Sequence, residues 1–336
     1  MWRLVSTLLA AAALSLSCSS GAATSRLARI RQRGVLVCGI FPGIAGFAEM
    51  DLAGHYRGFD VDMCRAVAAA TVGSADRIRY ERIASLDLFL GSNDIDIVSR
   101  RLTWSLRREG MHVLFGPVTF YDGQGFLVAR RVEGDDPTAL AGIPLCVAEG
   151  SEHDVTVTAY FRRHQIALQK VLVADGPAAG RALADGRCQA FSGDVSELAS
   201  VRSLLATPRD FRILRDRISR EPLAQLVRAE DIDLFNVLRW TVFAMIAAEE
   251  HGVSSTNVAT MAASDDPEIQ RLLGGNPGNG QALGLDEAWA RNVIAQVGNY
   301  GEVFERNLGV STPLGMERGL NALWTQGGLM FAPPLR

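Results

Sequence analysis

A serine and an arginine, Ser105 and Arg108, have the types and spacing of an anion-binding pair. They follow the apolar residues Ile95, Ile97 and Val98. Ser105 is a good helix N-cap, which would place Arg108 in the first helical turn. A cation there opposes the helix dipole unless an anion docks beside it, and a guanidinium binds a carboxylate through two parallel hydrogen bonds. Alternatively, Arg108 is a solvated surface charge.

Two further polar residues could complete such a site. Asp194 follows the predicted strand 188–192, and a carboxylate at the end of a strand is a suitable counter-ion for an ammonium group. Arg108 and Asp194 would together match the two charges of a zwitterion across a closing cleft. Ser151 begins another predicted helix, whose free amides could bind a carboxylate. The alternative is that Asp194 and Ser151 are ordinary helix caps.

The sequence offers little support for catalysis or for a metal centre. The five histidines lack metal-ligand spacing such as HExxH, and no GxSxG, GxxxxGKS/T or GxGxxG fingerprint occurs. We therefore expect no metal and no cofactor. An enzyme that acts on a small carboxylate, similar to a dehydratase, stays open as an alternative. Its general acid or base would be Glu152, His153 or Glu49.

Composition and charge narrow the class of protein. The chain has 336 residues, of which 48% are hydrophobic and 21% charged, which is enough for two globular domains. Its net charge is −3, and the first 23 residues contribute one arginine and no acid, so the remainder carries −4. No basic domain or block of basic residues is present, which argues against a nucleic-acid partner.

The first 23 residues have the pattern of a secretory signal peptide. Arg3 forms a minimal basic region, residues 4–16 are apolar, and small residues precede a cleavage site after Ala23. We therefore expect export of the mature chain. Cys18 leaves open a second possibility, a lipoprotein anchored through that cysteine.

Four cysteines remain after such a cleavage, an even number in an oxidising compartment. We expect disulfides between Cys38 and Cys64 and between Cys146 and Cys188, because each would join a strand to a nearby element of its own domain. The alternative is four buried free thiols.

Strands and helices alternate through two separate regions, which is typical of helix-covered parallel sheets. Ligands of such sheets lie beyond the carboxyl ends of the strands, where Ser105 and Arg108 are expected. Turn-forming residues at 121–125 and at Glu221-Pro222 predict two crossings between domains. In the first region we expect strands over 35–40, 78–83 and 96–99 and a helix over 58–73. In the second region we expect strands over 144–148, 168–173 and 188–192 and helices over 151–162, 177–185 and 195–205. Further helices are expected over 231–251, 286–297, 302–308 and 316–324.

From Leu27 to Arg336 the chain resembles periplasmic amino-acid-binding proteins of ABC importers, and most closely the general L-amino-acid-binding subgroup. The resemblance rests on long ungapped segments, among them Gly58-Phe-Asp-Val-Asp-Met-Cys64, Phe120-Tyr-Asp-Gly-Gln-Gly-Phe126, Val297-Gly-Asn-Tyr-Gly-Glu302 and Gly319-Leu-Asn-Ala-Leu-Trp324.

This resemblance implies an α/β fold, a two-lobed periplasmic binding protein of type II. Each lobe would be a helix-covered β-sheet, with two hinge crossings and extra C-terminal helices. One lobe would comprise residues 26–124 and 222–336, and the other residues 125–221. The protein would be a periplasmic monomer that closes on an amino acid and delivers it to the permease subunits of its transporter. A diverged paralogue that acts as a sensor is a further alternative.

The resemblance also implies roles for individual residues. Arg108 would hold the α-carboxylate, helped by donors near Thr103, Ser105 and Ser151. Asp194 would hold the α-ammonium group. A ring near Phe47 would cover the ligand side chain, and Trp104 is a further candidate for the cleft wall.

Several residues depart from the pattern of this subgroup. Asn-Thr is expected where this chain has Arg101-Leu102, and a second threonine where it has Glu152. Asn and Asp are expected in place of Phe41 and Gln189. These differences fall at the expected site, so they predict an altered ligand preference.

Overall fold

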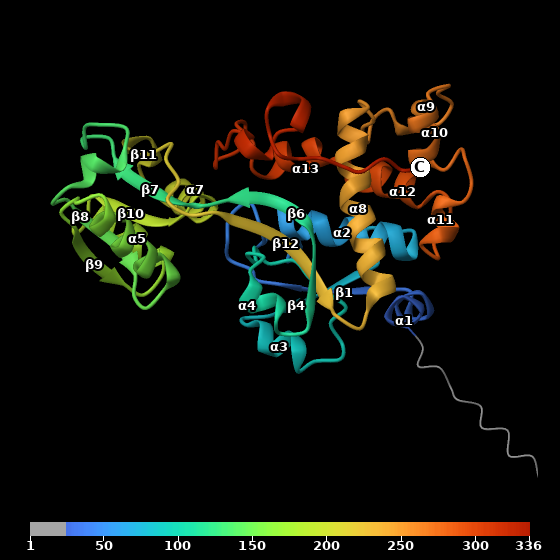
Figure 1. Ribbon diagram of the computed structural model, residues 1–336, viewed down its shortest axis with the longest axis horizontal. Coiled ribbons are helices and arrows are strands. Elements are labelled where there is room, and N and C mark those ends of the chain that lie inside the picture. Colours follow the sequence, from blue (N-terminus) through green and yellow to red (C-terminus); the bar gives the residue numbers. More distant parts are fainter. Residues whose placement is uncertain (1–24) are drawn as a thin grey trace, which may run out of the picture.

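The computed structural model describes residues 25–336 and contains two five-stranded sheets joined by two chain crossings (Figure 1). The expected signal peptide, its cleavage site and Cys18 lie outside the described residues. Within the described part, no helix combines the length and apolar character that a membrane span requires.

Sheet 1 has the strand order β4-β1-β5-β12-β6. Its strands are β1 (Leu36–Ile40), β4 (Ile78–Arg82), β5 (Ile97–Val98), β6 (Val113–Asp122) and β12 (Glu221–Arg228). Strand β1 pairs in parallel with β4 and β5, whereas β12 is antiparallel to β5 and β6. All residues of β1 are buried, as expected for a central parallel strand with both faces covered. The predicted strands of the first region are therefore confirmed.

Helix α2 (Phe59–Val72) packs beside β1 and begins at a glycine that the fold requires. Gly58 has a φ of 127°, and a Cβ atom there would lie 2.3 Å from the carbonyl oxygen of Phe47. Only glycine tolerates both conditions. The helix ends at Gly73 in the left-handed conformation, a common helix stop.

Sheet 2 has the strand order β11-β7-β10-β8-β9. Its strands are β7 (Gln124–Ala129), β8 (Pro144–Ala148), β9 (Gln169–Val173), β10 (Ala190–Asp194) and β11 (Phe211–Ile213), and its helices are α5 (Glu152–Arg163), α6 (Gly176–Ala184) and α7 (Val195–Leu204). Strand β8 is parallel to both β10 and β9, and β7 is antiparallel to β10. The predicted alternation of the second region is confirmed.

Lys170, the only lysine in the sequence, lies on β9. Its Nζ is 2.6 Å from Oδ1 of Asp154 on α5 and also donates to the hydroxyl of Thr158. This ion pair ties the edge strand of sheet 2 to the helix that covers it.

The crossings between the two sheets lie side by side. Strand β6 ends at Asp122, β7 begins at Gln124, and only Gly123 separates them. A Cβ atom on Gly123 would lie 2.7 Å from the carbonyl oxygen of Ser219. The returning strand begins at Glu221, which pairs with Asp122 across the ladder.

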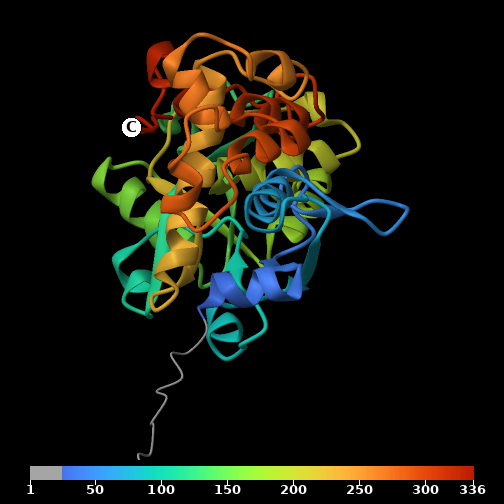
Figure 2. The same ribbon diagram turned by 90° about the vertical axis from the view of Figure 1, so that its right-hand side faces the viewer.

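The C-terminal region is mainly helical and packs on sheet 1 through α8 (Ile232–Glu250). Its helices are α9 (Val258–Met261), α10 (Pro267–Leu273), α11 (Asn279–Ala282), α12 (Trp289–Val297) and α13 (Tyr300–Asn307). Figure 2 shows these orange and red helices gathered beside α8. The predicted helix over 316–324 is wrong. That segment holds a 3₁₀ turn at Gly319–Asn321, and a second 3₁₀ turn begins at Trp324. Gly319 has a φ of 49°, which interrupts a right-handed helix.

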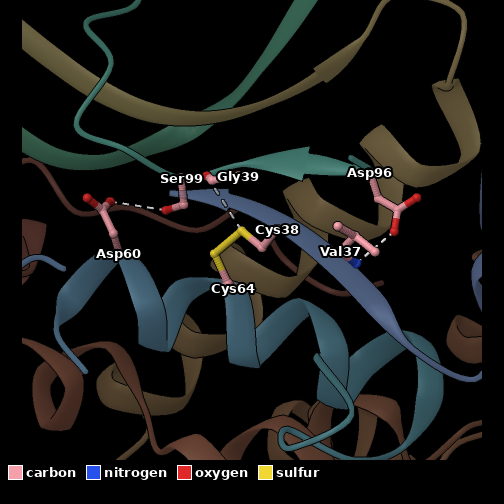
Figure 3. The surroundings of a disulfide bond; sticks show 7 residues. All are labelled: Val37, Cys38, Gly39, Asp60, Cys64, Asp96 and Ser99. Carbon is pink, nitrogen blue, oxygen red and sulfur yellow. Dashed lines mark hydrogen bonds between the residues drawn. A yellow bond between two sulfur atoms is a disulfide. The ribbon is translucent and has the colours of Figure 1, made fainter. Parts of the chain in front are cut away.

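Both expected disulfides are present. Cys38 on β1 is bonded to Cys64 on α2 (Figure 3). Cys146 on β8 is bonded to Cys188, just before β10. All four cysteines are buried, so each bond fastens the core of one sheet and not its surface.

A buried ionic cluster anchors α1 (Arg26–Arg33), a helix that the sequence analysis did not predict. The carboxylate of Asp96 is fully buried and accepts a hydrogen bond from the backbone amide of Val37 at 2.8 Å (Figure 3). Arg33 also donates to Asp96, and Arg26 lies 3.8 Å from it. Burial raises the pKa of Asp96, and these partners oppose that rise.

Candidate functional site

The loop that carries Arg108 leaves sheet 1 after β5. Residues 99–108 are called the arginine loop below. Helix α4 (Leu106–Glu109) is a single turn, and Ser105 precedes it in an extended conformation without capping it through its side chain. The helix dipole proposed from the sequence therefore has little weight here. Instead, Nη1 of Arg108 donates to the carbonyl oxygen of Thr103 at 2.8 Å, which orients the guanidinium.

Contacts with β12 hold the arginine loop beside the crossings. The hydroxyl of Thr103 donates to Oε2 of Glu221 at 2.8 Å, and the hydroxyl of Ser219 donates to Oε1 of the same carboxylate at 2.7 Å. The backbone amide of Trp104 donates to the carbonyl oxygen of Pro222 at 2.7 Å. The Trp104 ring is partly exposed and stacks on Phe115.

Two more arginines, Arg100 and Arg101, lie at the start of this loop. The guanidinium of Arg100 is 5.1 Å from the ring centroid of Phe41, and that of Arg101 is 5.4 Å from the ring centroid of Phe47. Burial lowers the pKa of Arg100, and the charges of Arg108 and Arg101 lower it further. Sequence reasoning identified Arg101 only as a departure from the family pattern and did not single out Arg100.

Phe47 does not stand free in this conformation. Its side chain is 1% exposed, and its ring contacts Phe59 and Phe120 at centroid distances of 5.9 and 5.5 Å. Arg101 lies over the same ring. A ligand side chain that approaches Phe47 would therefore meet the guanidinium of Arg101.

On sheet 2, Asp194 lies at the end of β10 and forms an ion pair with His153. Its Oδ1 is 3.0 Å from Nε2 of His153, and its side chain does not cap α7. Burial alone would raise the pKa of Asp194, but the hydrogen bond and charge of His153 outweigh it, so the pKa lies below its usual value. Burial likewise opposes protonation of His153, yet its contacts with Asp194 raise its pKa. The sequence suggested His153 only as a possible general acid or base, and not as a partner of Asp194.

Ser151 has a purely local role in this conformation. Its hydroxyl donates to the carbonyl oxygen of Ala148 at 2.6 Å and accepts from the backbone amide of Asp154 at 3.2 Å. It thus caps α5, and among the described residues it makes no hydrogen bond to His153. Glu152 is exposed at the start of α5, and Glu49 lies on β2 (Glu49–Met50) beside Arg57.

Buried acids and amides complete the region between the sheets. Gln124 donates from Nε2 to the hydroxyl of Ser192 at 2.9 Å and to the carbonyl oxygen of His153 at 2.8 Å. Burial and the charge of Asp194 raise the pKa of Asp122 to about 6. Burial also raises the pKa of Asp60 to about 6, although Ser99 donates to it at 3.0 Å (Figure 3).

The two halves of the site act on each other electrostatically. The charges of Arg101 and Arg108 lower the pKa of Asp194, which ends β10. The site thus presents guanidinium groups from sheet 1 and a carboxylate from sheet 2. Among residues 25–336 no cluster of three or more histidine, cysteine or acidic side chains could hold a metal ion.

Comparisons with known proteins agree with this architecture. No family model matches the sequence. The chain is 40% identical to the general L-amino acid-binding periplasmic protein AapJ of Rhizobium johnstonii, over 99% of each chain. It is also 40% identical to the glutamate/glutamine/aspartate/asparagine-binding protein BztA of Rhodobacter capsulatus, over 96% of this chain and 97% of the relative.

A solved structure shows the same fold throughout. The ABC transporter periplasmic binding protein from Brucella ovis, solved with glutathione bound, is 38% identical and superposes with a TM-score of 0.86, covering 93% of this chain and 99% of that one. With relatives of this identity along its full length, the chain belongs to the periplasmic amino-acid-binding proteins of ABC transporters.

Proposed function

We propose that the chain binds an amino acid, or a ligand with an amino-acid end, between the two sheets and delivers it to a membrane permease. Arg108 binds the α-carboxylate and Asp194 binds the α-ammonium group. Thr103, Ser105 and Ser151 are candidate further donors to the carboxylate.

The observation that carries this proposal is the pairing of unlike charges across the site. Within the described residues, no carboxylate oxygen lies within 4.0 Å of the Arg108 guanidinium, so it is available to an anion. Asp194 stays ionised well below neutral pH because its pKa is lowered. A zwitterion satisfies both groups at once, and a fixed guanidinium binds a carboxylate with defined geometry.

The chain arrangement supports a closing cleft. Residues 26–124 with 222–336 form one lobe in this proposal, and residues 125–221 form the other. The paired crossings at Asp122 and Glu221 would be the hinge between them. Phe47 and Trp104 would line the cleft from the first lobe. The protein acts as a periplasmic monomer after removal of residues 1–23, or as a lipoprotein if Cys18 is the processing site.

The relatives suggest which ligands to test first. The name of BztA lists glutamate, glutamine, aspartate and asparagine, and the Brucella ovis protein was solved with glutathione. The panel should therefore hold the twenty amino acids and glutathione. A ligand that binds only the folded state raises the melting temperature, so thermal shift is a suitable first screen.

Arg108→Ala tests the carboxylate anchor. Removing the guanidinium would leave the ligand carboxylate unpaired in the closed cleft, which should weaken binding by about 2 to 5 kcal/mol in isothermal titration. Arg107→Ala is the matched control, because Arg107 is the exposed neighbour on the same short helix and its replacement should leave affinity unchanged. The proposal fails if no member of the panel binds the wild type more tightly than millimolar.

A further inference from the structure

Arg101 stands in an unusual backbone conformation at the entrance to the arginine loop. Its φ is +54°, in the left-handed region that non-glycine residues rarely adopt. Its backbone N–H contributes to stabilising the carboxylate of Asp60, and its neighbour Leu102 is buried. Contacts on both sides therefore fix a conformation that an isolated chain would avoid.

Two of the three guanidinium nitrogen atoms of Arg101 have no hydrogen-bond partner among residues 25–336. Its Nε and Nη1 atoms are buried without any hydrogen bond, and no carboxylate oxygen of residues 25–336 lies within 4.0 Å of it. Buried donors without acceptors are costly, more so when they carry charge. A ligand that supplied acceptor oxygens here would remove that cost.

The position of Arg101 indicates which part of a ligand it would meet. It lies over the ring of Phe47, whereas the guanidinium of Arg108 donates to the carbonyl oxygen of Thr103. Its charge also lowers the pKa of Asp194 and Glu197. Phe47 is the ring expected to cover the ligand side chain, so a side chain held there by an amino acid bound to Arg108 and Asp194 would meet Arg101.

We propose that Arg101 binds a second carboxylate, carried by the ligand side chain, so that the protein prefers acidic amino acids over their amides. This inference rests on the proposed function. A planar guanidinium matches a carboxylate through paired hydrogen bonds. A side-chain amide carries no charge, and its NH₂ group would face the donors of Arg101.

The competing explanation is that Arg101 only compensates the nearby acids. Its charge lowers the pKa of Asp60, Asp122 and Glu197, all of which are raised by burial. If Arg101 were only a structural counter-ion, replacing it would change the affinity for all ligands alike. A side-chain anchor would affect acidic ligands alone, and this difference can be measured.

The test is isothermal titration of the chain from residue 24 onward with L-glutamate, L-glutamine, L-aspartate and L-asparagine. Each acid should bind the wild type at least tenfold more tightly than its amide. Arg101→Asn should weaken binding of the acids roughly 10- to 100-fold and change that of the amides less than about threefold. Arg107→Asn is the control with the same change of charge on an exposed residue, and it should alter neither class.

Three results would overturn the inference: amides that bind the wild type as tightly as the acids, a preference that survives Arg101→Asn, or equal weakening of both classes. If Arg101→Asn does not fold, the comparison of acids with amides in the wild type still tests the preference for acids. Arg101→Lys then takes the place of Arg101→Asn, because lysine keeps the charge but lacks the planar fork that binds a carboxylate. Failure of the proposed function looks different, because then neither acids nor amides would bind.

Discussion

Replacing both Cys146 and Cys188 by alanine removes the covalent link between β8 and β10. These strands lead to Ser151 and Asp194, so the bond fastens the part of sheet 2 that carries its half of the site. The two cysteines are 42 residues apart in sequence. In the chain-entropy model, a loop of that length lowers the entropy of the unfolded state by about 13 cal/mol/K, or about 4 kcal/mol at 25 °C.

The same calculation for the disulfide between Cys38 and Cys64, which are 26 residues apart, gives a stabilisation of about 3.5 kcal/mol. Each double variant should therefore melt roughly 5 to 15 °C below the wild type. Binding at 25 °C should change little in the Cys146/Cys188 variant, because backbone pairing between β8 and β10 holds the strands in register without the bond.

Calorimetry of residues 24–336 with and without a reductant measures this effect. Reductant should lower the melting temperature of the wild type and leave a variant with all four cysteines replaced unaffected. A thiol titration of the unfolded wild type without reductant should find no free thiol. A melting temperature for Cys146→Ala/Cys188→Ala within about 2 °C of the wild type would refute the loop-entropy reasoning.

The ion pair between His153 and Asp194 should make stability depend on pH. The pKa of His153 is raised above 6.5 and that of Asp194 is lowered below 3.8, so the pair stabilises the folded state fully from about pH 4 to about pH 6.5. Its contribution fades as the pH rises through the raised pKa of His153, and it is also lost as the pH falls through the lowered pKa of Asp194. The gap in melting temperature between the wild type and His153→Gln should shrink from about pH 6 to about pH 9, and a constant gap would contradict the assignment. Glu221→Gln should lower the free energy of unfolding by about 1 to 2 kcal/mol in urea titration, because one of its hydrogen bonds from Thr103 and Ser219 loses its charged acceptor. An unchanged midpoint of urea unfolding would show that these hydrogen bonds do not contribute to the free energy of unfolding.

The sheet strands and both disulfides followed from the sequence because their signals are local. Apolar segments such as 35–40 have to be buried, and alternation with helices indicates a parallel sheet. The prediction of a helix over 316–324 was wrong because the apolar residues of this segment have the spacing of a helix, whereas the left-handed conformation of Gly319 is visible only in the structure. Helix α1 was missed because arginines dominate its sequence, and its anchor Asp96 is distant along the chain.

The site was less predictable than the fold. His153 and Asp194 are separated by 41 residues, and no local pattern links them. Arg101 has a positive φ angle and its guanidinium lies over Phe47, and the residue type at that position predicts neither feature. Contacts between distant segments determine both features, so only the folded structure reveals them.

The single lysine of this chain makes it unusually suitable for chemical labelling. An amine-reactive dye would modify one side chain, Lys170 on β9, apart from the amino terminus. All four cysteines of the described residues are in disulfides, so one engineered cysteine on sheet 1 would offer a unique thiol for a second dye. Energy transfer between the two fluorophores would then report the separation of the sheets in solution, turning the protein into an optical sensor of its own ligand.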